Sequence, residues 1–206
     1  RLYTALAEVL AAVLYAQAMP PRMDKRLCWS ITVVWAGLLA VFLQLTGDVP
    51  LVWWIPCMTA AIGWIYLYLW GTRAMNLLEA GYSCARAFIL AELAASVEWQ
   101  LHCVLWPQQG AGKPLSLVLL AVVYVALYGF LYLLEQRRAT AARLTITTAA
   151  MLMAVVMAVT VFAVSNLSFV SNGEATMSVF YIRTLVDFAG VLILSVQHEQ
   201  LWKAAI

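Results

Sequence analysis

The 206-residue sequence predicts an all-α, polytopic transmembrane bundle of about seven helices. Three observations support this fold class. Hydrophobic residues make up 65% of the chain and charged residues 11%, whereas an average soluble domain has roughly 45–50% and roughly 25%. Apolar runs recur that are long enough for a helix to cross ~30 Å of hydrocarbon. These runs are continuous and do not alternate with polar residues, which argues against a transmembrane β-barrel.

Seven apolar segments are expected to be helices. They cover approximately residues 2–19, 28–46, 51–70, 82–105, 115–135, 143–164 and 178–202. The first segment is not followed by a small-residue cleavage site, so we expect a membrane span and not a signal peptide. The second and third segments are separated only by "TGDVP", which predicts an antiparallel hairpin.

The other connections also contain residues that interrupt helices. They read "MPPRMDKR", "GTRAMNLLEAG", "WPQQGAGKP", "QRRATAA" and "SNLSFVSNGEATM". The last segment differs, because "GVLILSVQHEQLW" contains no Gly or Pro after Gly190. We therefore expect the last helix to continue unbroken beyond the bilayer. The whole chain, 1–206, is expected to form a single transmembrane domain.

The distribution of basic residues predicts the orientation in the membrane. The first, third and fifth connections and the C-terminal tail hold eight Lys and Arg residues, and the opposite side holds two. Cytoplasmic loops carry the excess of positive charge, so the N-terminus is expected outside and the C-terminus in the cytoplasm. The lipid bilayer is the expected partner. The eight residues are Arg22, Lys25, Arg26, Arg73, Arg137, Arg138, Arg143 and Lys203, against Arg1 and Lys113.

Several functions are disfavoured by the same residues. The net charge of +2 is small, and the basic residues are scattered between apolar runs, so no nucleic-acid partner is expected. The four cysteines form no CxxC pair and have no His at metal spacing, so neither a metal site nor a cofactor is expected. A retinal pigment would need a Lys in the last span, and the sequence has none there. The "HEQ" at 198–200 lacks the second His of a metalloprotease motif, and no catalytic residue is predicted.

Ionisable residues inside the predicted spans are the main candidates for a functional site. Each costs roughly 2.5–3.5 kcal/mol at the centre of a membrane helix, so each should face the bundle and find a partner. Asp187 lies one helical turn from Arg183, and His102 lies one turn from Glu98. The candidates are Glu8, Glu98, His102, Arg183 and Asp187, with Arg86 and Glu92 as secondary buried polar residues.

Counting residues from the predicted helix ends places the five main candidates in the outer half of the membrane. We expect the first, fourth and seventh helices to bring them together around Arg183, the only fixed cation of the group. Arg86 should lie at the inner end of its helix, and Glu92 near mid-membrane with no obvious partner. His198 is expected to be solvated at the cytoplasmic mouth. Three interpretations of the cluster stay open: structural ion pairs, a ligand or ion site, or a catalytic site.

Three stretches resemble a known family. "FYIRTLVDFAGVLILSVQHEQL" is similar to the last membrane helix of the GHKL-type sensor histidine kinases of Firmicutes. "AELAASVEWQLHC" and the opening "RLYTALAE" resemble other parts of the N-terminal transmembrane sensor domain of that family. The resemblance extends over nearly all of the chain in order and spacing.

The resemblance implies a signalling function and a location in the bacterial cytoplasmic (inner) membrane. In that family, the last helix continues into a cytoplasmic coiled coil with the phosphoaccepting His, and an ATP-binding domain follows. Neither part is present in these residues, so we expect the chain to be the sensor half of such a kinase. The family also implies a homodimer through the cytoplasmic helix, a ligand at the outer half and a response regulator. His198 matches the membrane-exit segment and not the phosphorylated position.

Two other functions stay open. A small transporter or permease-like protein could move a polar solute through the same buried charges. A structural partner subunit would need these charges only for folding. Solute flux distinguishes the first from a sensor, and the second predicts that the buried charges affect stability alone.

Overall fold

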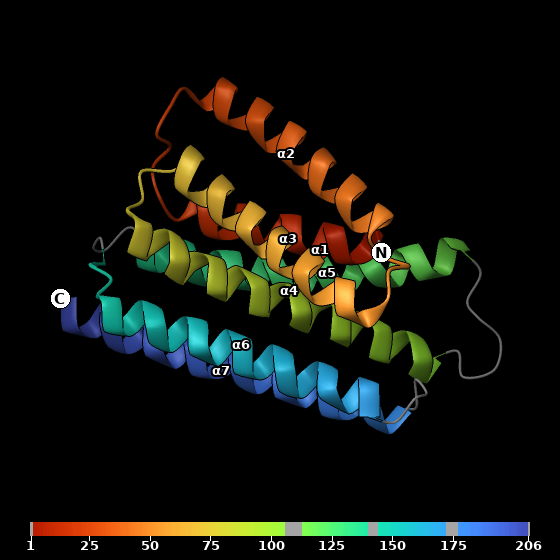
Figure 1. Ribbon diagram of the computed structural model, residues 1–206. Coiled ribbons are helices and arrows are strands. Elements are labelled where there is room, and N and C mark those ends of the chain that lie inside the picture. Colours follow the sequence, from red (N-terminus) through yellow and green to blue (C-terminus); the bar gives the residue numbers. More distant parts are fainter. Residues whose placement is uncertain (1, 106–112, 140–143, 172–176, 206) are drawn as a thin grey trace.

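The computed structural model describes residues 2–105, 113–139, 144–171 and 177–205. These residues form seven α-helices and no strand (Figure 1). The predicted all-α fold class is therefore confirmed. The helices are α1 (Leu2–Gln17), α2 (Lys25–Leu45), α3 (Leu51–Thr72), α4 (Leu77–Leu105), α5 (Lys113–Ala139), α6 (Thr148–Ser171) and α7 (Met177–Ala205).

The helix starts that differ most from the predicted positions are those of α4 and α6, and local capping explains both differences. α4 begins at residue 77 and not at 82, because Asn76 and Glu79 cap each other. The backbone N–H of Glu79 donates to Asn76 Oδ1 (2.7 Å), and the backbone N–H of Asn76 donates to Glu79 Oε2 (3.3 Å). α6 begins at residue 148, where Thr147 Oγ1 accepts a hydrogen bond from the N–H of Ala150 (3.2 Å). The predicted start at 143 lies outside the described residues.

Five helices are long and apolar enough to cross a membrane, which indicates a multi-pass membrane protein. α1 has 16 residues and is shorter, ~24 Å long at ~1.5 Å per residue. α7 has 29 residues and carries charged side chains along its length. The crossing of α1 and α7 therefore stays a prediction. The five helices contain Lys25–Leu45, Val52–Thr72, Leu77–Leu105, Pro114–Gln136 and Thr148–Leu167.

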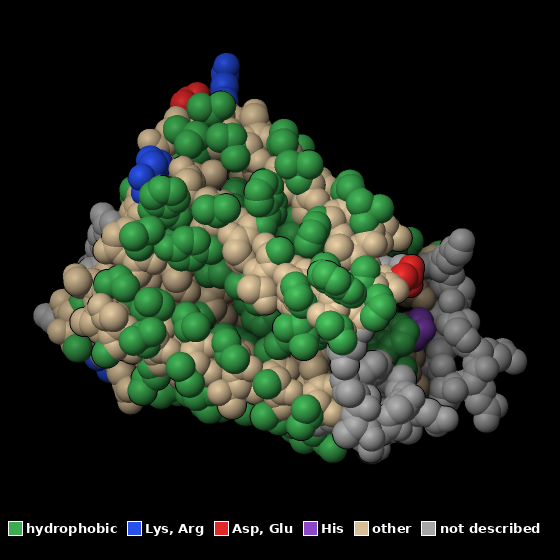
Figure 2. Space-filling view, in the orientation of Figure 1, with side chains coloured by type: hydrophobic (Ala, Val, Ile, Leu, Met, Phe, Trp, Pro, Cys, Tyr) green, Lys and Arg blue, Asp and Glu red, His purple; other side chains and the backbone are tan. Residues whose placement is uncertain are grey.

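The surface of the bundle is apolar, as a surrounding lipid phase requires. Val33 on α2, Val125 on α5 and Leu167 on α6 are each about 70% exposed. Figure 2 shows hydrophobic side chains over the described part of the viewed face, with the charged ones toward its borders. Exposed apolar surface of this extent is a liability in water and is normal for helices that face lipid.

Helix α4 is the centre of the bundle. It packs against α1, α3, α5, α6 and α7, while α6 and α7 lie side by side along its length (Figure 1). Half of its apolar stretch is buried, against 28% for each of the other four candidate spans. Small side chains on α4, among them Ala80, Ala87 and Ala94, are at most 1% exposed and allow neighbouring helices to approach closely. Polar residues on α4 are consequently enclosed by protein.

The contact between α6 and α7 depends on one glycine. A Cβ atom at Gly190 would lie 2.8 Å from Cγ2 of Val161, a distance that real Cβ atoms essentially never show, and 3.1 Å from Cγ1, which is tighter than most real contacts. Both atoms belong to a β-branched side chain with little rotamer freedom. Gly190 therefore sets how closely α7 packs against α6.

The α2–α3 hairpin, confirmed as predicted, is attached at its base by a backbone network. The connection before α2 pairs with the connection after α3 through the Pro21–Arg73 bridge. Arg22 donates from Nε to the carbonyl of Arg73 (3.1 Å) and from Nη2 to the carbonyl of Met75 (2.8 Å). The N–H of Ala74 donates to the carbonyl of Pro20 (3.0 Å). These bonds satisfy loop backbone groups and hold both ends of the hairpin together.

The helices alternate in direction, so the bundle has two distinct ends. α1, α3, α5 and α7 end where α2, α4 and α6 begin, and we call this the basic end (Figure 1). Arg22, Lys25, Arg26, Arg73 and Lys203 lie in the connections and helix termini of this end. The placement agrees with the charge asymmetry of the sequence. Which side of a membrane the basic end faces remains the prediction made above.

Candidate functional site: two polar clusters on the last helix

The first polar cluster joins α7 to the middle of α4, and we call it the mid-bundle cluster (Glu92, Ser96, Arg183 and Asp187). Arg183 Nη2 donates to Glu92 Oε2 at 2.9 Å. Ser96 Oγ donates to Asp187 Oδ2 at 2.6 Å. α4 and α7 are antiparallel, so the two contacts cross and the long Arg183 side chain reaches past Asp187 toward Glu92. The cluster ties two turns of α7 to two turns of α4.

This pairing corrects the prediction for Arg183. The sequence suggested Glu8, Glu98 or Asp187 as its partner and none for Glu92, but the ion pair is with Glu92. Counting residues from helix ends measures depth along each axis only. It does not include the several ångströms over which an Arg side chain can extend from its own level in the membrane.

Several buried polar atoms around the cluster have no hydrogen-bond partner among the described residues. They include both carboxylate oxygens of Glu8, which is 1% exposed. Oδ1 of Asp187, which is 0% exposed, also lacks a hydrogen bond of normal geometry, although the buried hydroxyl of Ser165 lies close enough to interact with it. Nε of Arg183 and Oγ1 of Thr184 are also without a partner. Buried polar groups of folded proteins are almost always paired, so such a concentration needs an explanation. The mid-bundle cluster is thus only partly satisfied by the protein itself.

A cavity of about 730 Å³ opens beside the mid-bundle cluster. Glu92 and Arg183 lie on its wall, and most of its other lining residues are apolar. Trp54 and Phe162 stack there with ring centroids 5.5 Å apart. The cavity lies between the α2–α3 tip and the end of α6, away from the basic end. An apolar cavity with a few convergent polar groups is the usual form of a small-molecule site.

The two remaining outer-half candidates lie elsewhere on α4. Glu98 is buried, 4% exposed, and His102 is half-buried with its ring stacked on Trp99 at 5.6 Å. Glu98 and His102 influence each other electrostatically, as their spacing of one turn predicts. The structure therefore places Arg183 and Asp187 in one cluster, with Glu8 buried and acted on by the charge of Glu92. Glu98 and His102 form a separate pair nearer the end of α4.

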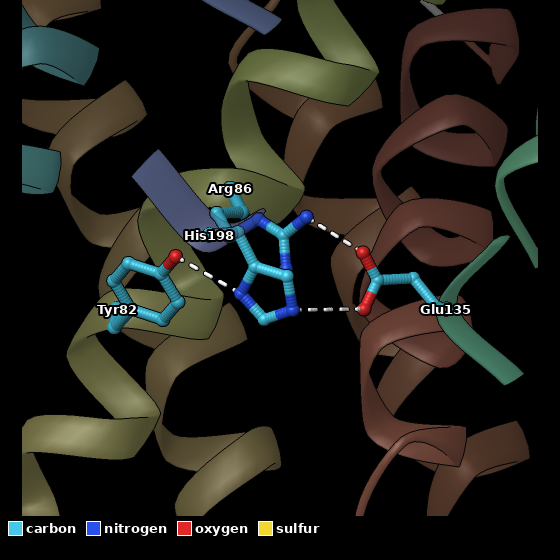
Figure 3. Close-up of polar contacts among 4 residues, drawn as sticks. All are labelled: Tyr82, Arg86, Glu135 and His198. Atoms are coloured by element: carbon cyan, nitrogen blue, oxygen red, sulfur yellow. Dashed lines mark hydrogen bonds and ion pairs between the residues drawn. The ribbon is translucent and has the colours of Figure 1, made fainter. Parts of the chain in front are cut away.

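The second polar cluster lies at the basic end, and we call it the basic-end cluster (Tyr82, Arg86, Glu135 and His198; Figure 3). Arg86 Nη2 donates to Glu135 Oε1 at 2.6 Å, and the other oxygen of Glu135 lies 3.7 Å from His198 Nε2. The Tyr82 hydroxyl and His198 Nδ1 are 3.1 Å apart. All four residues are buried, with exposed fractions of 8% or less. The cluster joins α4, α5 and α7.

Aromatic rings complete the surroundings of Arg86. Its guanidinium lies 4.7 Å from the ring centroid of Tyr15 on α1 and 5.8 Å from that of Tyr82. Such cation–π contacts stabilise a cation that has left water. A cavity of about 320 Å³ borders the cluster and is lined by these residues together with Glu79 and Trp202. In contrast to the mid-bundle cluster, the charge of Arg86 is fully matched by its neighbours.

The basic-end cluster was only partly foreseen. Arg86 was expected to be buried at this end, and it is 5% exposed. His198 was expected to be solvated, which is wrong: its ring packs in parallel on Tyr82 at 5.9 Å and is 8% exposed. Glu135 was missed, although it lies at the end of the fifth segment, level with Arg86. A rule that pairs every buried charge with an opposite charge at the same depth would have found it.

The chemistry that these clusters support is the binding and exchange of ionic partners. Among the described residues, no group of three His, Cys, Asp or Glu lies close enough to hold a metal ion. Asp187 and His198 are eleven residues apart on α7, ~16 Å along the helix axis. α7 therefore contributes side chains to both clusters.

In comparisons with known proteins, no protein family, curated protein or solved structure matches this chain.

Proposed function

We propose that this chain is the membrane-embedded input domain of a sensor histidine kinase of the GHKL type. The observation that carries the proposal is that α7 contributes to two polar clusters, each of which also contains α4. A movement of α7 at the mid-bundle cluster must therefore change the contacts of His198 at the basic end. α7 is the element that would transmit the signal toward a kinase.

The unequal satisfaction of the clusters supports a two-state mechanism. A ligand shifts a protein between two arrangements by the difference between its affinities for them. The partly unpaired mid-bundle cluster offers polar atoms that a ligand can satisfy in one arrangement. Small translations or rotations of one helix are a common way to carry such a change. The cavity of about 730 Å³ beside Arg183 is the place where we expect the ligand.

The kinase part of the proposal comes from the sequence resemblance and from the length of α7. This helix continues without a Gly or Pro after Gly190 to the end of its described residues at Ala205. In the proposed protein, it would extend into a coiled coil that forms a homodimer and bears the phosphoaccepting His. A response regulator would then be the downstream partner. A coding sequence that continues from Ile206 into such domains would support this assignment, and a stop codon there would contradict it.

Hydrogen exchange in lipid nanodiscs tests whether the clusters are coupled. Arg183→Ala should change the exchange of residues 196–205, because the loss of the Glu92 pair alters the position of α7. Val125→Ala is the matched control, since that side chain is 73% exposed on α5. Exchange that changes only near residue 183 would contradict the proposal. In the intact kinase, the same variant should lock or abolish signalling.

A transporter is the second candidate, and two deeply buried carboxyl groups favour it specifically. Glu8 and Asp187 are fully buried carboxyl groups within the bundle, as in proteins that move ions through membrane helices. Proteoliposomes containing only this chain would distinguish the two functions. Solute or proton flux that is lost in Asp187→Asn would support transport, and a tight membrane would support the sensor.

A further inference from the structure

We propose that the cavity beside Arg183 binds a single-chain amphiphile with a carboxylate head group. The carboxylate would bind the Arg183 guanidinium, and the hydrocarbon chain would lie along the apolar wall. This inference deepens the proposed function, on which it rests for the idea that occupancy of the cavity moves α7. The argument for the chemical class of the ligand does not depend on the proposed function and uses only the residues that line the cavity.

The preference for a carboxylate head group follows from the hydrogen bonds and the exposure of the Arg183 guanidinium. Its ion pair uses Nη2, while Nε has no partner among the described residues and is itself buried, so a ligand reaches Nε only when the Glu92 contact shifts. The guanidinium is a planar fork that binds carboxylates through two parallel hydrogen bonds, so it has donor capacity left. The Arg183 side chain is 21% exposed and Glu92 only 6%, so the cation is the more accessible partner. An incoming ligand in the cavity therefore meets a positive charge first.

Glu92 acts as an internal competitor in this arrangement. Its carboxylate already accepts a hydrogen bond from Arg183, and a carboxylate ligand would bind the guanidinium in the same way. A ligand that replaces or shares this contact weakens the tie between α4 and α7. The effect on α7 then comes directly from the exchange of one carboxylate for another.

The apolar wall accounts for the rest of the ligand. Leu43, Met58, Val159 and Phe162 line the cavity, and they come from α2, α3 and α6. Its volume of about 730 Å³ lies within the ~300–1,000 Å³ typical of small-molecule sites. A cationic amphiphile would face Arg183 and be repelled. A neutral one would leave the spare donors of Arg183 unsatisfied, which costs affinity.

Equilibrium binding of radiolabelled hexadecanoate to the whole chain in zwitterionic nanodiscs tests the inference. Hexadecanol, hexadecyltrimethylammonium and an anionic phospholipid serve as competitors. Hexadecanoate should bind ~10-fold more tightly than hexadecanol, the value of one charge-assisted contact. Glu92→Gln should tighten hexadecanoate binding, because it removes the competitor. The double variant Arg183→Gln with Glu92→Gln keeps a neutral polar pair and should lose the preference for the carboxylate.

A variant in the apolar wall separates the site from the bulk lipid. Ala163 lies on the cavity wall on the exposed side of α6, so Ala163→Phe should fold and fill the space. It should weaken hexadecanoate and hexadecanol alike, and Gly129→Ala on α5 should change neither. Equal binding of all three amphiphiles, weaker binding in Glu92→Gln, or full competition by the anionic phospholipid would each overturn the inference.

The two proposals fail in different ways. If hexadecanoate binds in the expected order but leaves exchange at residues 196–205 unchanged, the ligand class stands and the sensor function is wrong. If hexadecanoate does not bind while Arg183→Ala still changes that exchange, the ligand class is wrong and the coupling stands.

Discussion

The two polar clusters are built on the same pair of helices, yet they differ in how well their charges are matched. At the basic end, Arg86 has Glu135 at 2.6 Å and two aromatic rings within 6 Å. In the mid-bundle cluster, Arg183 has one ion pair and Nε of its guanidinium has no partner in the described part of the chain, while Oδ1 of Asp187 has only the nearby Ser165 hydroxyl, outside normal hydrogen-bond geometry. The first arrangement holds helices together, and the second leaves bonding capacity unused.

This difference indicates a division of roles along α7. A fully paired buried network resists rearrangement, because every broken contact leaves a charge in a low-dielectric interior. A partly paired network loses less when it changes partners. We therefore expect the basic-end cluster to dominate stability and the mid-bundle cluster to dominate the response to a ligand. The following substitutions test that expectation, from the largest effect to the smallest.

Glu135→Ala should be the most destabilising change, because it leaves the buried guanidinium of Arg86 without its ion pair. Breaking a buried pair in this way costs about 3–5 kcal/mol. Reversible unfolding in mixed micelles, followed by tryptophan fluorescence, measures the loss. Glu199→Ala is the control, since its pair with Lys203 is solvent-exposed and contributes only ~0.2–1 kcal/mol. Equal effects of the two variants would mean that Arg86 finds another partner.

Ser96→Ala removes the 2.6 Å hydrogen bond that Ser96 Oγ donates to Asp187 Oδ2 in the mid-bundle cluster. Hydrogen bonds to charged groups contribute about 1.5–3 kcal/mol, so the loss should be smaller than at Glu135. The same unfolding measurement checks the ranking. Ser30→Ala is a suitable control, because that hydroxyl donates to its own helix at an exposed position. A larger loss in Ser96→Ala than in Glu135→Ala would invert the proposed division of roles.

Gly190→Ala tests the part of α7 between the clusters. The added methyl group would meet Val161 at 2.8 Å and force α6 and α7 apart, and overpacking of this kind costs about 1–3 kcal/mol. Gly129→Ala is matched, because no atom lies within 4 Å of a Cβ at that position. Hydrogen exchange of α7 should rise toward both clusters in the first variant only. Unchanged exchange would show that Val161 gives way and that the contact is not rigid.

Glu8→Leu should have the smallest effect and the opposite sign. Both carboxylate oxygens of Glu8 are buried without a partner among the described residues, so an apolar side chain of similar size removes an uncompensated cost. We expect a gain of about 1 kcal/mol in the free energy of unfolding. A loss of stability would show that Glu8 has a partner, and transport or signalling that fails in a more stable variant would identify a functional carboxyl group.

The helical fold could be predicted from the sequence because it follows from the order of apolar runs and helix breakers along the chain. Apolar runs and the breakers between them predict helices at their approximate positions, and the five-residue connection "TGDVP" predicts the hairpin. The exact helix starts were missed where a side chain caps the backbone, as Asn76 and Thr147 do. Such caps depend on single hydrogen bonds that hydrophobicity does not register.

The candidate site was harder to predict because it depends on which face of each helix points inward. Buried charges could be identified as a group, and Arg183, Asp187, Glu92 and Arg86 are all in polar clusters. Their partners required knowledge of rotation about the helix axes. Ser96 and Tyr82 are polar without being charged, so an argument based on the cost of burying charge does not select them.

The backbone network at the base of the α2–α3 hairpin has a mechanical consequence. Arg22 and the Pro21–Arg73 bridge restrain the hairpin at the basic end, whereas Thr46, Gly47 and Val49 at its tip form part of the cavity wall. The hairpin is therefore restrained at the basic end, which can act as a pivot, while its tip borders the cavity and packs on α6 through Trp54 and Phe162. A rotation of ~5° about a pivot ~30 Å away displaces the tip by ~2.6 Å, since α2 rises ~1.5 Å per residue. Widening the cavity in this way leaves the basic-end cluster at the pivot almost unmoved.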